Sequence, residues 1–231
     1  MAKTLAVIPA RGGSKRIPRK NIKPFLGVPI IKYSIDAAIG SAAFDEVMTS
    51  TDDDEIARLS ASYGAKVPFL RSAKSSDDHA TTVDVLEEVI LRYRDLGRPF
   101  DYLCCIYPTA PFVTPDKLKR AMELLRESGA DSVVPVVRFS YPIQRALKIE
   151  SGRAVMFWPE HYSSRSQDLT PAYHDCGQFY CVRVDSMLRQ RRLFAEHTVP
   201  LEVSELEVQD IDNEEDWKLA ELKLGAMTRP T

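Results

Sequence analysis

The sequence predicts an α/β fold in which a mostly parallel sheet is covered by helices on both faces. Short apolar runs alternate with amphipathic stretches through the first 140 of the 231 residues, and this βαβα succession is typical of parallel sheets. Residues that start and stop helices bound the amphipathic stretches. The length suits one large domain whose core needs neither disulfides nor a structural metal.

The first eight elements follow from this alternation. Buried strands are expected where apolar residues run together, at 4–10, 44–51, 101–108 and 131–139. Helices are expected between them, at 29–42, 52–64, 81–97 and 114–129. The second helix has acids in its first turn and Gly64 at its end. The fourth has Thr114 as its cap, Pro115 at its first position and Gly129 at its stop.

The alternation breaks between about Ser140 and Tyr173, where the chain is rich in Pro, Ser and Arg. We predict that 140–173 forms a hairpin-like arm inserted into a single domain of residues 1–231. Beyond the arm the rhythm returns, with a strand at 177–184, a helix at 184–194, a strand at 198–203 and a helix at 213–227.

Composition argues against several classes of protein. A formal net charge of −2 does not suit a surface built for nucleic acid. The N-terminal apolar stretch is too short for a signal peptide, and we expect no membrane span. The four cysteines include an adjacent pair inside an apolar run. This arrangement favours reduced, buried thiols and a cytoplasmic location.

A cluster of cations follows the first predicted strand, in the sequence IPARGGSKRIPRKN from Ile8 to Asn21. We call residues 11–20 the basic loop. Its glycines, Gly12 and Gly13, let the backbone turn tightly and present N–H groups to a ligand, and its cations suit a triphosphate. The spacing differs from that of Walker A and dinucleotide-binding loops.

A solvated basic turn is the alternative interpretation of the basic loop. Its position favours a phosphate site, because ligands of doubly wound sheets gather at the carboxyl ends of the strands. The loops at 50–54 and 107–112 follow other predicted strands and lie at the same edge. We therefore expect the three loops to form one site.

These motifs resemble those of the cytidylyltransferases that activate acidic sugars, the CMP-sialic acid synthetase family. The resemblance rests on the basic loop, on STDDDEIA at 50–57, on YPTAPF at 107–112 and on QDIDNEEDW at 209–217, and it extends from Leu5 to Leu222. The stretches 101–118 and 165–180 are most similar to the pseudaminic acid branch of the family. The resemblance implies a Rossmann-like, three-layer nucleotidyltransferase fold with a protruding dimerisation arm.

The implied reaction joins the anomeric hydroxyl of a nine-carbon keto-sugar acid to the α-phosphate of CTP and releases pyrophosphate. The similarity to the pseudaminic acid branch implies that the sugar is pseudaminic acid and the product CMP-pseudaminic acid. Sialic or legionaminic acid as substrate is an alternative, as is a nucleotide-binding protein without turnover. The resemblance assigns nucleotide-binding roles to Arg11, Gly13, Ser14, Lys15, Asn21 and Arg71. Lys15 and Lys20 are the expected catalytic cations, because they can follow the leaving pyrophosphate.

An aspartate pair is the expected metal site. Asp210 and Asp212 lie two residues apart, so in an extended segment both side chains point to one face, and hard oxygen ligands suit Mg²⁺. On its own, Asp212 is better explained as the cap of the C-terminal helix, because aspartate is preferred at that position. The family's aspartate pair favours the catalytic metal interpretation. The acids of 52–55 are expected to start a helix, with metal binding there as a weaker alternative.

The sugar is expected to contact residues of the arm and of the segment after it. The resemblance implies substrate binding by Gln144, Arg165, Tyr173 and Gln178, with Arg165 reaching the site of a neighbouring subunit. The arm would then build a homodimer, which Phe157 and Trp158 would suit if they are exposed. An ordinary packing role is the alternative for Tyr173.

Overall fold

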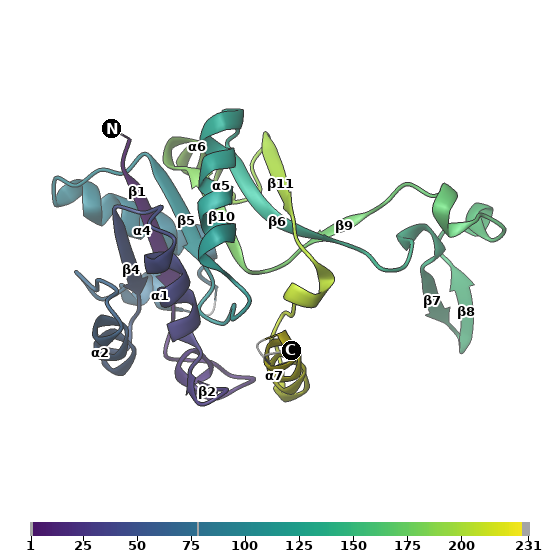
Figure 1. Ribbon diagram of the computed structural model, residues 1–231, viewed down its shortest axis with the longest axis horizontal. Helices are drawn as coiled ribbons and strands as arrows, with labels where there is room; N and C mark the ends of the chain where they lie inside the picture. Colours follow the sequence, from purple (N-terminus) through teal and green to yellow (C-terminus); the bar gives the residue numbers. More distant parts are fainter. Residues whose placement is uncertain (1, 78, 228–231) are drawn as a thin grey trace.

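The apolar runs form one central sheet in the computed structural model, which describes residues 2–77 and 79–227. Within these residues the sheet has seven strands in the order β11-β6-β10-β5-β1-β4, and β9 pairs with β6 (Figure 1). The strands are β1 Thr4–Pro9, β4 Glu46–Ser50, β5 Tyr102–Ile106, β6 Ser132–Arg138, β9 Tyr173–Asp175, β10 Phe179–Arg183 and β11 Thr198–Glu202. The predicted strands are therefore confirmed.

The sheet is mostly parallel because β4, β1, β5, β6 and β11 point in one direction. The strand after the arm, β10, is antiparallel and lies between β5 and β6, where Cys181 is opposite Cys104. This insertion places the β9–β10 connection beside the carboxyl end of β5, since Tyr107 N donates to Gln178 O at 2.9 Å.

Helices cover both faces of the sheet, as the alternation of side chains along β1 requires. Ala6 and Ile8 point to one face and pack with α1 Ile31–Gly40, α2 Asp54–Ser62 and α5 Pro115–Ser128. Leu5 and Val7 point to the other face and pack with α4 Thr82–Asp95 and α6 Val184–Gln190. The three-layer α/β architecture is confirmed.

The helix boundaries follow the sequence signals. Thr114 caps α5 by accepting a hydrogen bond from Lys117 N, and Gly129 ends it in the left-handed conformation with φ of 64°. Gly64 has φ of 95° after α2. Asp53 caps α2 by accepting hydrogen bonds from Glu55 N and Ile56 N, so the predicted helix start in the acidic segment is confirmed.

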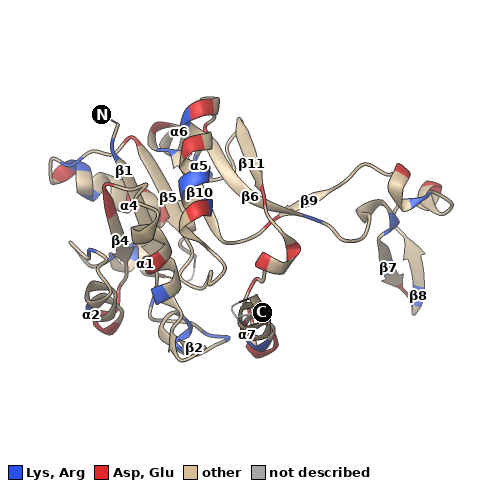
Figure 2. Ribbon diagram, in the orientation of Figure 1, with Lys and Arg blue, Asp and Glu red and all other residues tan. Residues whose placement is uncertain are grey.

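A separate small core joins the basic loop to the C-terminal helix α7 Glu214–Met227. Ile17 of the loop is buried there with Ile211 and with Trp217 of α7. The ring of Phe25, in the short β2 Pro24–Phe25 that pairs with β3 Val28–Pro29, packs edge-on against Trp217 at 5.5 Å. In Figure 2, basic residues mark the chain around β2 and acidic residues mark the neighbouring α7.

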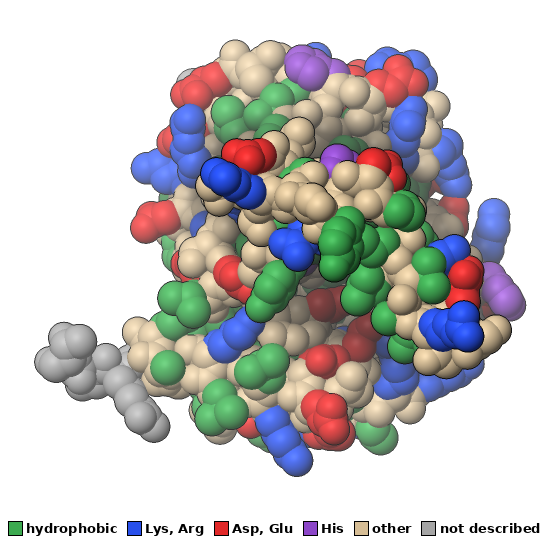
Figure 3. Space-filling model, turned by 90° about the vertical axis from the view of Figure 1, so that its right-hand side faces the viewer, with side chains coloured by type: hydrophobic (Ala, Val, Ile, Leu, Met, Phe, Trp, Pro, Cys, Tyr) green, Lys and Arg blue, Asp and Glu red, His purple; other side chains and the backbone are tan. Residues whose placement is uncertain are grey.

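The predicted arm projects from the body of the protein (Figure 1). Its strands β7 Leu147–Glu150 and β8 Arg153–Met156 form a hairpin that is separate from the central sheet. Phe157 and Trp158 are 54% and 41% exposed, which is large for such side chains. The face of the molecule that the arm presents carries hydrophobic side chains among charged ones (Figure 3).

The state of the cysteines and the character of the helices were also predicted from the sequence. All four cysteines are unpaired and buried, as predicted. Among residues 2–77 and 79–227, no helix has both the length and the apolar character needed to cross a bilayer. The described residues also form the one-turn helix α3 Ala73–Ser76 and short 3₁₀ helices at Lys20–Ile22, Ile143–Arg145, Pro159–His161, Ser166–Asp168 and Glu205–Glu207.

Candidate active site

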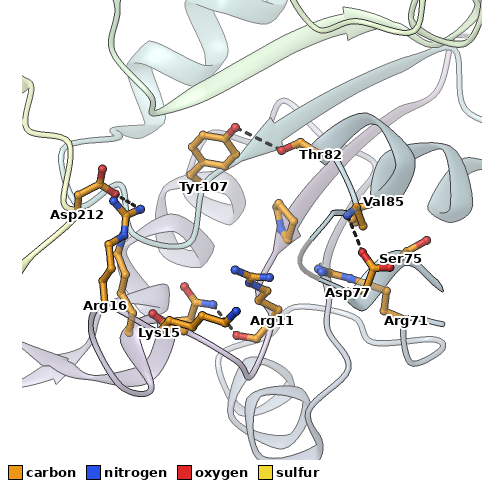
Figure 4. A pocket seen from close by; sticks show the side chains of 15 residues that line it. Arg11, Lys15, Arg16, Arg71, Ser75, Asp77, Thr82, Val85, Tyr107 and Asp212 are labelled. Carbon is orange, nitrogen blue, oxygen red and sulfur yellow. Dashed lines mark hydrogen bonds and ion pairs between the residues drawn. The ribbon is translucent and has the colours of Figure 1, made fainter. Parts of the chain in front are cut away.

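A cavity of about 490 Å³ opens at the carboxyl ends of β1, β4 and β5 (Figure 4). Its lining comes from the basic loop, the segment between α2 and α3, the α3–α4 region, the loop after β5 and the segment before α7. Among the residues predicted from sequence, those in the lining are Arg11, Ser14, Lys15, Lys20, Asn21, Arg71 and Asp212. The fold therefore brings most of the predicted nucleotide-binding and catalytic residues together.

The basic loop is closed at its base by a hydrogen bond in which Asn21 Nδ2 donates to Arg11 O at 2.9 Å. Ser14 N donates to Gly12 O at 3.2 Å, which makes the turn tight. Gly13 is exposed, and a Cβ built on it would meet no protein atom within 4 Å. Lys15 and Arg16 are exposed at the loop's outer part, while Ile17 is fully buried behind it.

Lys20 occupies the junction between the loop and the aspartate pair. Its Nζ donates to Ile211 O, so the ammonium lies beside the backbone of the residue between Asp210 and Asp212. Burial lowers the pKa of Lys20, and the charges of Asp212 and Asp210 act in the opposite direction. The arrangement holds a cation at the place where negative charge of a bound nucleotide would collect.

Asp212 points into the cavity, and its Oδ1 is 2.7 Å from Arg16 (Figure 4). It does not cap α7. That role belongs to Asn213, whose Oδ1 accepts hydrogen bonds from Glu215 N at 2.8 Å and Asp216 N at 3.0 Å. Asp216 returns the interaction by accepting from Asn213 N at 3.1 Å, a reciprocal cap. The alternative that Asp212 starts the helix is therefore wrong.

Asp210 lies next to the cavity lining instead of in it. Burial, together with the charge of Asp212, raises the pKa of Asp210. Two carboxylates that repel each other in a partly buried site are stabilised by a cation that lies between them. The described residues hold no group of three or more His, Cys, Asp or Glu side chains that could enclose a metal ion. The donor set fits Mg²⁺, which commonly takes one or two carboxylates and completes its shell with phosphate and water.

Arg71 forms another part of the cavity wall and is not an exposed surface charge. Its Nε donates to Ser50 Oγ at 3.1 Å, and a terminal nitrogen donates to Ser50 O. Its backbone N donates to Thr51 O at 2.8 Å. Burial lowers the pKa of Arg71. These bonds fix the guanidinium against the end of β4, where a planar donor group can face a flat base.

The wall also includes residues that were not predicted from the sequence, and one cation of the basic loop lies outside it. Tyr107 and Thr82 line the cavity, with their hydroxyl oxygens 3.4 Å apart; Tyr107 belongs to the YPTAPF motif, which was the available signal. Arg19 also belongs to the basic loop. Its guanidinium instead pairs with Asp53 at 2.5 Å and with Glu55, outside the cavity lining.

The predicted sugar-binding residues do not line this cavity within one chain. Gln144 and the exposed Arg165 lie on the arm, and Tyr173 lines a second hollow with His174 and Asp175. Gln178 is buried beside Tyr107 and donates from Nε2 to Glu207 O at 2.6 Å. The assignments of these residues therefore stay predictions.

A strand-end cavity that combines a basic loop with a carboxylate pair is typical of enzymes that transfer nucleotides. The chain belongs to the cytidylyltransferase family, whose model matches residues 5–198. It is 43% identical to a pseudaminic acid cytidylyltransferase of Campylobacter jejuni over 95% of both chains. It is 33% identical to a CMP-N,N'-diacetyllegionaminic acid synthase of Legionella pneumophila over 94% of both.

A solved structure of CMP:2-keto-3-deoxy-manno-octonic acid synthetase complexed with CTP is similar in fold. Its TM-score is 0.70 with 18% sequence identity, covering 98% of this chain and 100% of the other. At this identity the comparison supports the architecture alone, and it agrees with the three-layer nucleotidyltransferase fold predicted from the sequence.

Proposed function

We propose that the chain transfers CMP from CTP to the anomeric hydroxyl of pseudaminic acid and releases pyrophosphate. The observation that carries the proposal is the strand-end cavity in which cations of the basic loop face Asp212, with Lys20 beside both aspartates. The similarity to the Campylobacter jejuni enzyme, which extends over nearly the whole of both chains, supports pseudaminic acid as the sugar substrate. The unpaired thiols suit a reaction in the cytoplasm.

The chemistry requires charge neutralisation and alignment, and little covalent participation by the protein. The anomeric hydroxyl releases its proton to water and its oxygen forms a bond to the α-phosphorus, while the bond from that phosphorus to the bridging oxygen breaks and pyrophosphate leaves. Arg11, Lys15 and Lys20 would neutralise the triphosphate, and Arg71 would orient the nucleotide. Asp210 and Asp212 would hold Mg²⁺, which supplies Lewis-acid stabilisation of the phosphates when bound.

A panel of acidic sugars tests the substrate. Pyrophosphate release from CTP and Mg²⁺ would be measured with pseudaminic, legionaminic and sialic acids and with the eight-carbon Kdo. We expect kcat/KM for pseudaminic acid to exceed that of every other sugar by about a hundredfold, because a site that hydrogen-bonds specific substituents rejects analogues that leave its polar groups unpaired. If the enzyme prefers another sugar, the proposed CMP transfer stands and the proposed substrate is wrong. CTP binding without turnover on any sugar would contradict the proposed enzyme.

We further propose that the enzyme is a homodimer in which each arm completes the partner's site. This arrangement is supported by the exposed Phe157 and Trp158 and by the projection of the arm, which carries Arg165, away from the body of the protein (Figure 1). Arg165→Ala and Lys15→Ala should each be nearly inactive. Co-expressed, the two variants should recover about a quarter of the wild-type activity, since half of the dimers are mixed and one of their two sites is intact. A lack of recovery, or a monomer by light scattering, would overturn the shared site.

A further inference from the structure

The acids of 52–55 are a feature that the proposed chemistry does not use, and their contacts lie at both ends of the basic loop. At the first end, Gly12 N donates to Asp52 Oδ1 at 3.0 Å. The backbone of Gly12 also packs on Asp53, because a Cβ added to Gly12 would lie 2.7 Å from Asp53 Oδ2. A side chain at position 12 would have to displace the Asp53 carboxylate, so glycine suits the close approach of the loop to the acidic segment.

At the other end of the loop, Arg19 contacts the same segment. Arg19 has a left-handed backbone with φ of 54°, which is uncommon for a residue with a side chain. Its guanidinium makes two hydrogen bonds to Asp53, at 2.5 and 3.3 Å, and one to Glu55. The hydrogen bonds from Arg19 lower the pKa of Asp53 to about 2, so the pair is charged throughout the neutral range.

We propose that Asp52 and Asp53 position the basic loop for the triphosphate by holding its two ends, at Gly12 and Arg19, on the start of α2. Ile17, which lies between these ends, is buried against Trp217 and Ile211 and attaches the middle of the loop to the body of the protein. Lys15 and Arg16 lie between Gly12 and Ile17, and both line the cavity. A loop that is ordered before binding avoids the entropic cost of ordering it on the ligand.

For the affinity of the protein for CTP, a positioning role of Asp53 predicts a change opposite in sign to the one that simple electrostatics predicts. A carboxylate near an anion site repels the anion, so its removal should tighten CTP binding if charge alone mattered. If Asp53 positions the loop, its removal should weaken binding instead. The inference rests on the proposed function insofar as CTP is the ligand of the loop.

Asp53→Asn is the decisive variant, because asparagine caps a helix as well as aspartate does but cannot form the ion pair with Arg19. We expect its Kd for CTP, measured by calorimetry in the full-length protein, to rise about tenfold. Asp54→Asn is the matched control, since Asp54 is exposed, adjacent and equally charged, and its Kd should stay within about twofold of wild type. The double variant that combines Arg19→Gln with Asp53→Asn should have a Kd for CTP no higher than the higher of the two single-variant values, because both substitutions break the same contact.

Trypsin cleavage at Lys15 and Arg16 gives a readout without any ligand. We expect Asp53→Asn to be cut in the loop about tenfold faster than wild type, because cleavage follows the population of the open loop. Unchanged cleavage together with equal or tighter CTP binding would overturn the proposal, even if the thermal stability falls. Should wild type fail to bind CTP, the proposed function fails, and the cleavage rates alone decide whether the acids hold the loop.

Discussion

Replacing Asp212 by asparagine is expected to lower kcat about a thousandfold, which corresponds to roughly 4 kcal/mol of transition-state stabilisation. Asparagine keeps the size of the side chain but removes the charge that faces the cavity and pairs with Arg16 at 2.7 Å. Since Asp210 and Asp212 are the proposed Mg²⁺ ligands, the affinity for Mg²⁺ in the presence of CTP should fall as well. Pyrophosphate release at several Mg²⁺ concentrations measures both effects.

The fold should survive this substitution, which makes the result interpretable. The side chains of Arg16 and Asp212 are 68% and 44% exposed, and such ion pairs contribute little to stability. The cap of α7 is provided by Asn213 and is not touched. Glu215→Gln removes the same charge from an exposed position of α7 and should leave kcat unchanged. Near-normal turnover in Asp212→Asn would remove this carboxylate from the catalytic machinery.

Much of the fold could be predicted because its signals are local. Apolar runs identified the strands, and caps such as Thr114 and Gly129 identified the helix ends. The position of β10 could not be predicted. Its antiparallel insertion between β5 and β6 depends on how the long arm returns the chain to the sheet, and alternation along the sequence carries no information about that path.

The candidate site shows the same limit at the level of single residues. Arg16 and Arg19 are equivalent in a pattern of charges, yet Arg16 lines the cavity and Arg19 does not. The left-handed backbone at Arg19 directs its side chain to Asp53, a contact between segments that are far apart in sequence. Asp212 and Asn213 are likewise neighbouring candidates for a helix cap, and the hydrogen bonds to Asn213 separate them.

Lys20→Met is the second substitution with a large expected effect, a loss of about 10² to 10³-fold in kcat. Lys20 is the cation that the fold places next to both aspartates, with its Nζ donating to Ile211 O. Methionine preserves much of the apolar stem but removes the charge and the hydrogen bond. The aspartates would then face the triphosphate without this cation. The negative charge that develops on the leaving pyrophosphate would no longer be stabilised by the Lys20 ammonium.

Lys23→Met is the matched control because it removes the same charge three residues further along the chain. Lys23 pairs with Glu214 at 2.6 Å and lies 4.6 Å from the centre of the Trp217 ring, so its loss should lower the melting temperature and leave kcat unchanged. Lys20→Arg should retain part of the activity, since it keeps the charge with a different shape. If Lys20→Met and Lys23→Met lose stability and activity in parallel, then Lys20 only joins the loop to α7; a selective loss of kcat in Lys20→Met identifies the ammonium as part of the chemistry.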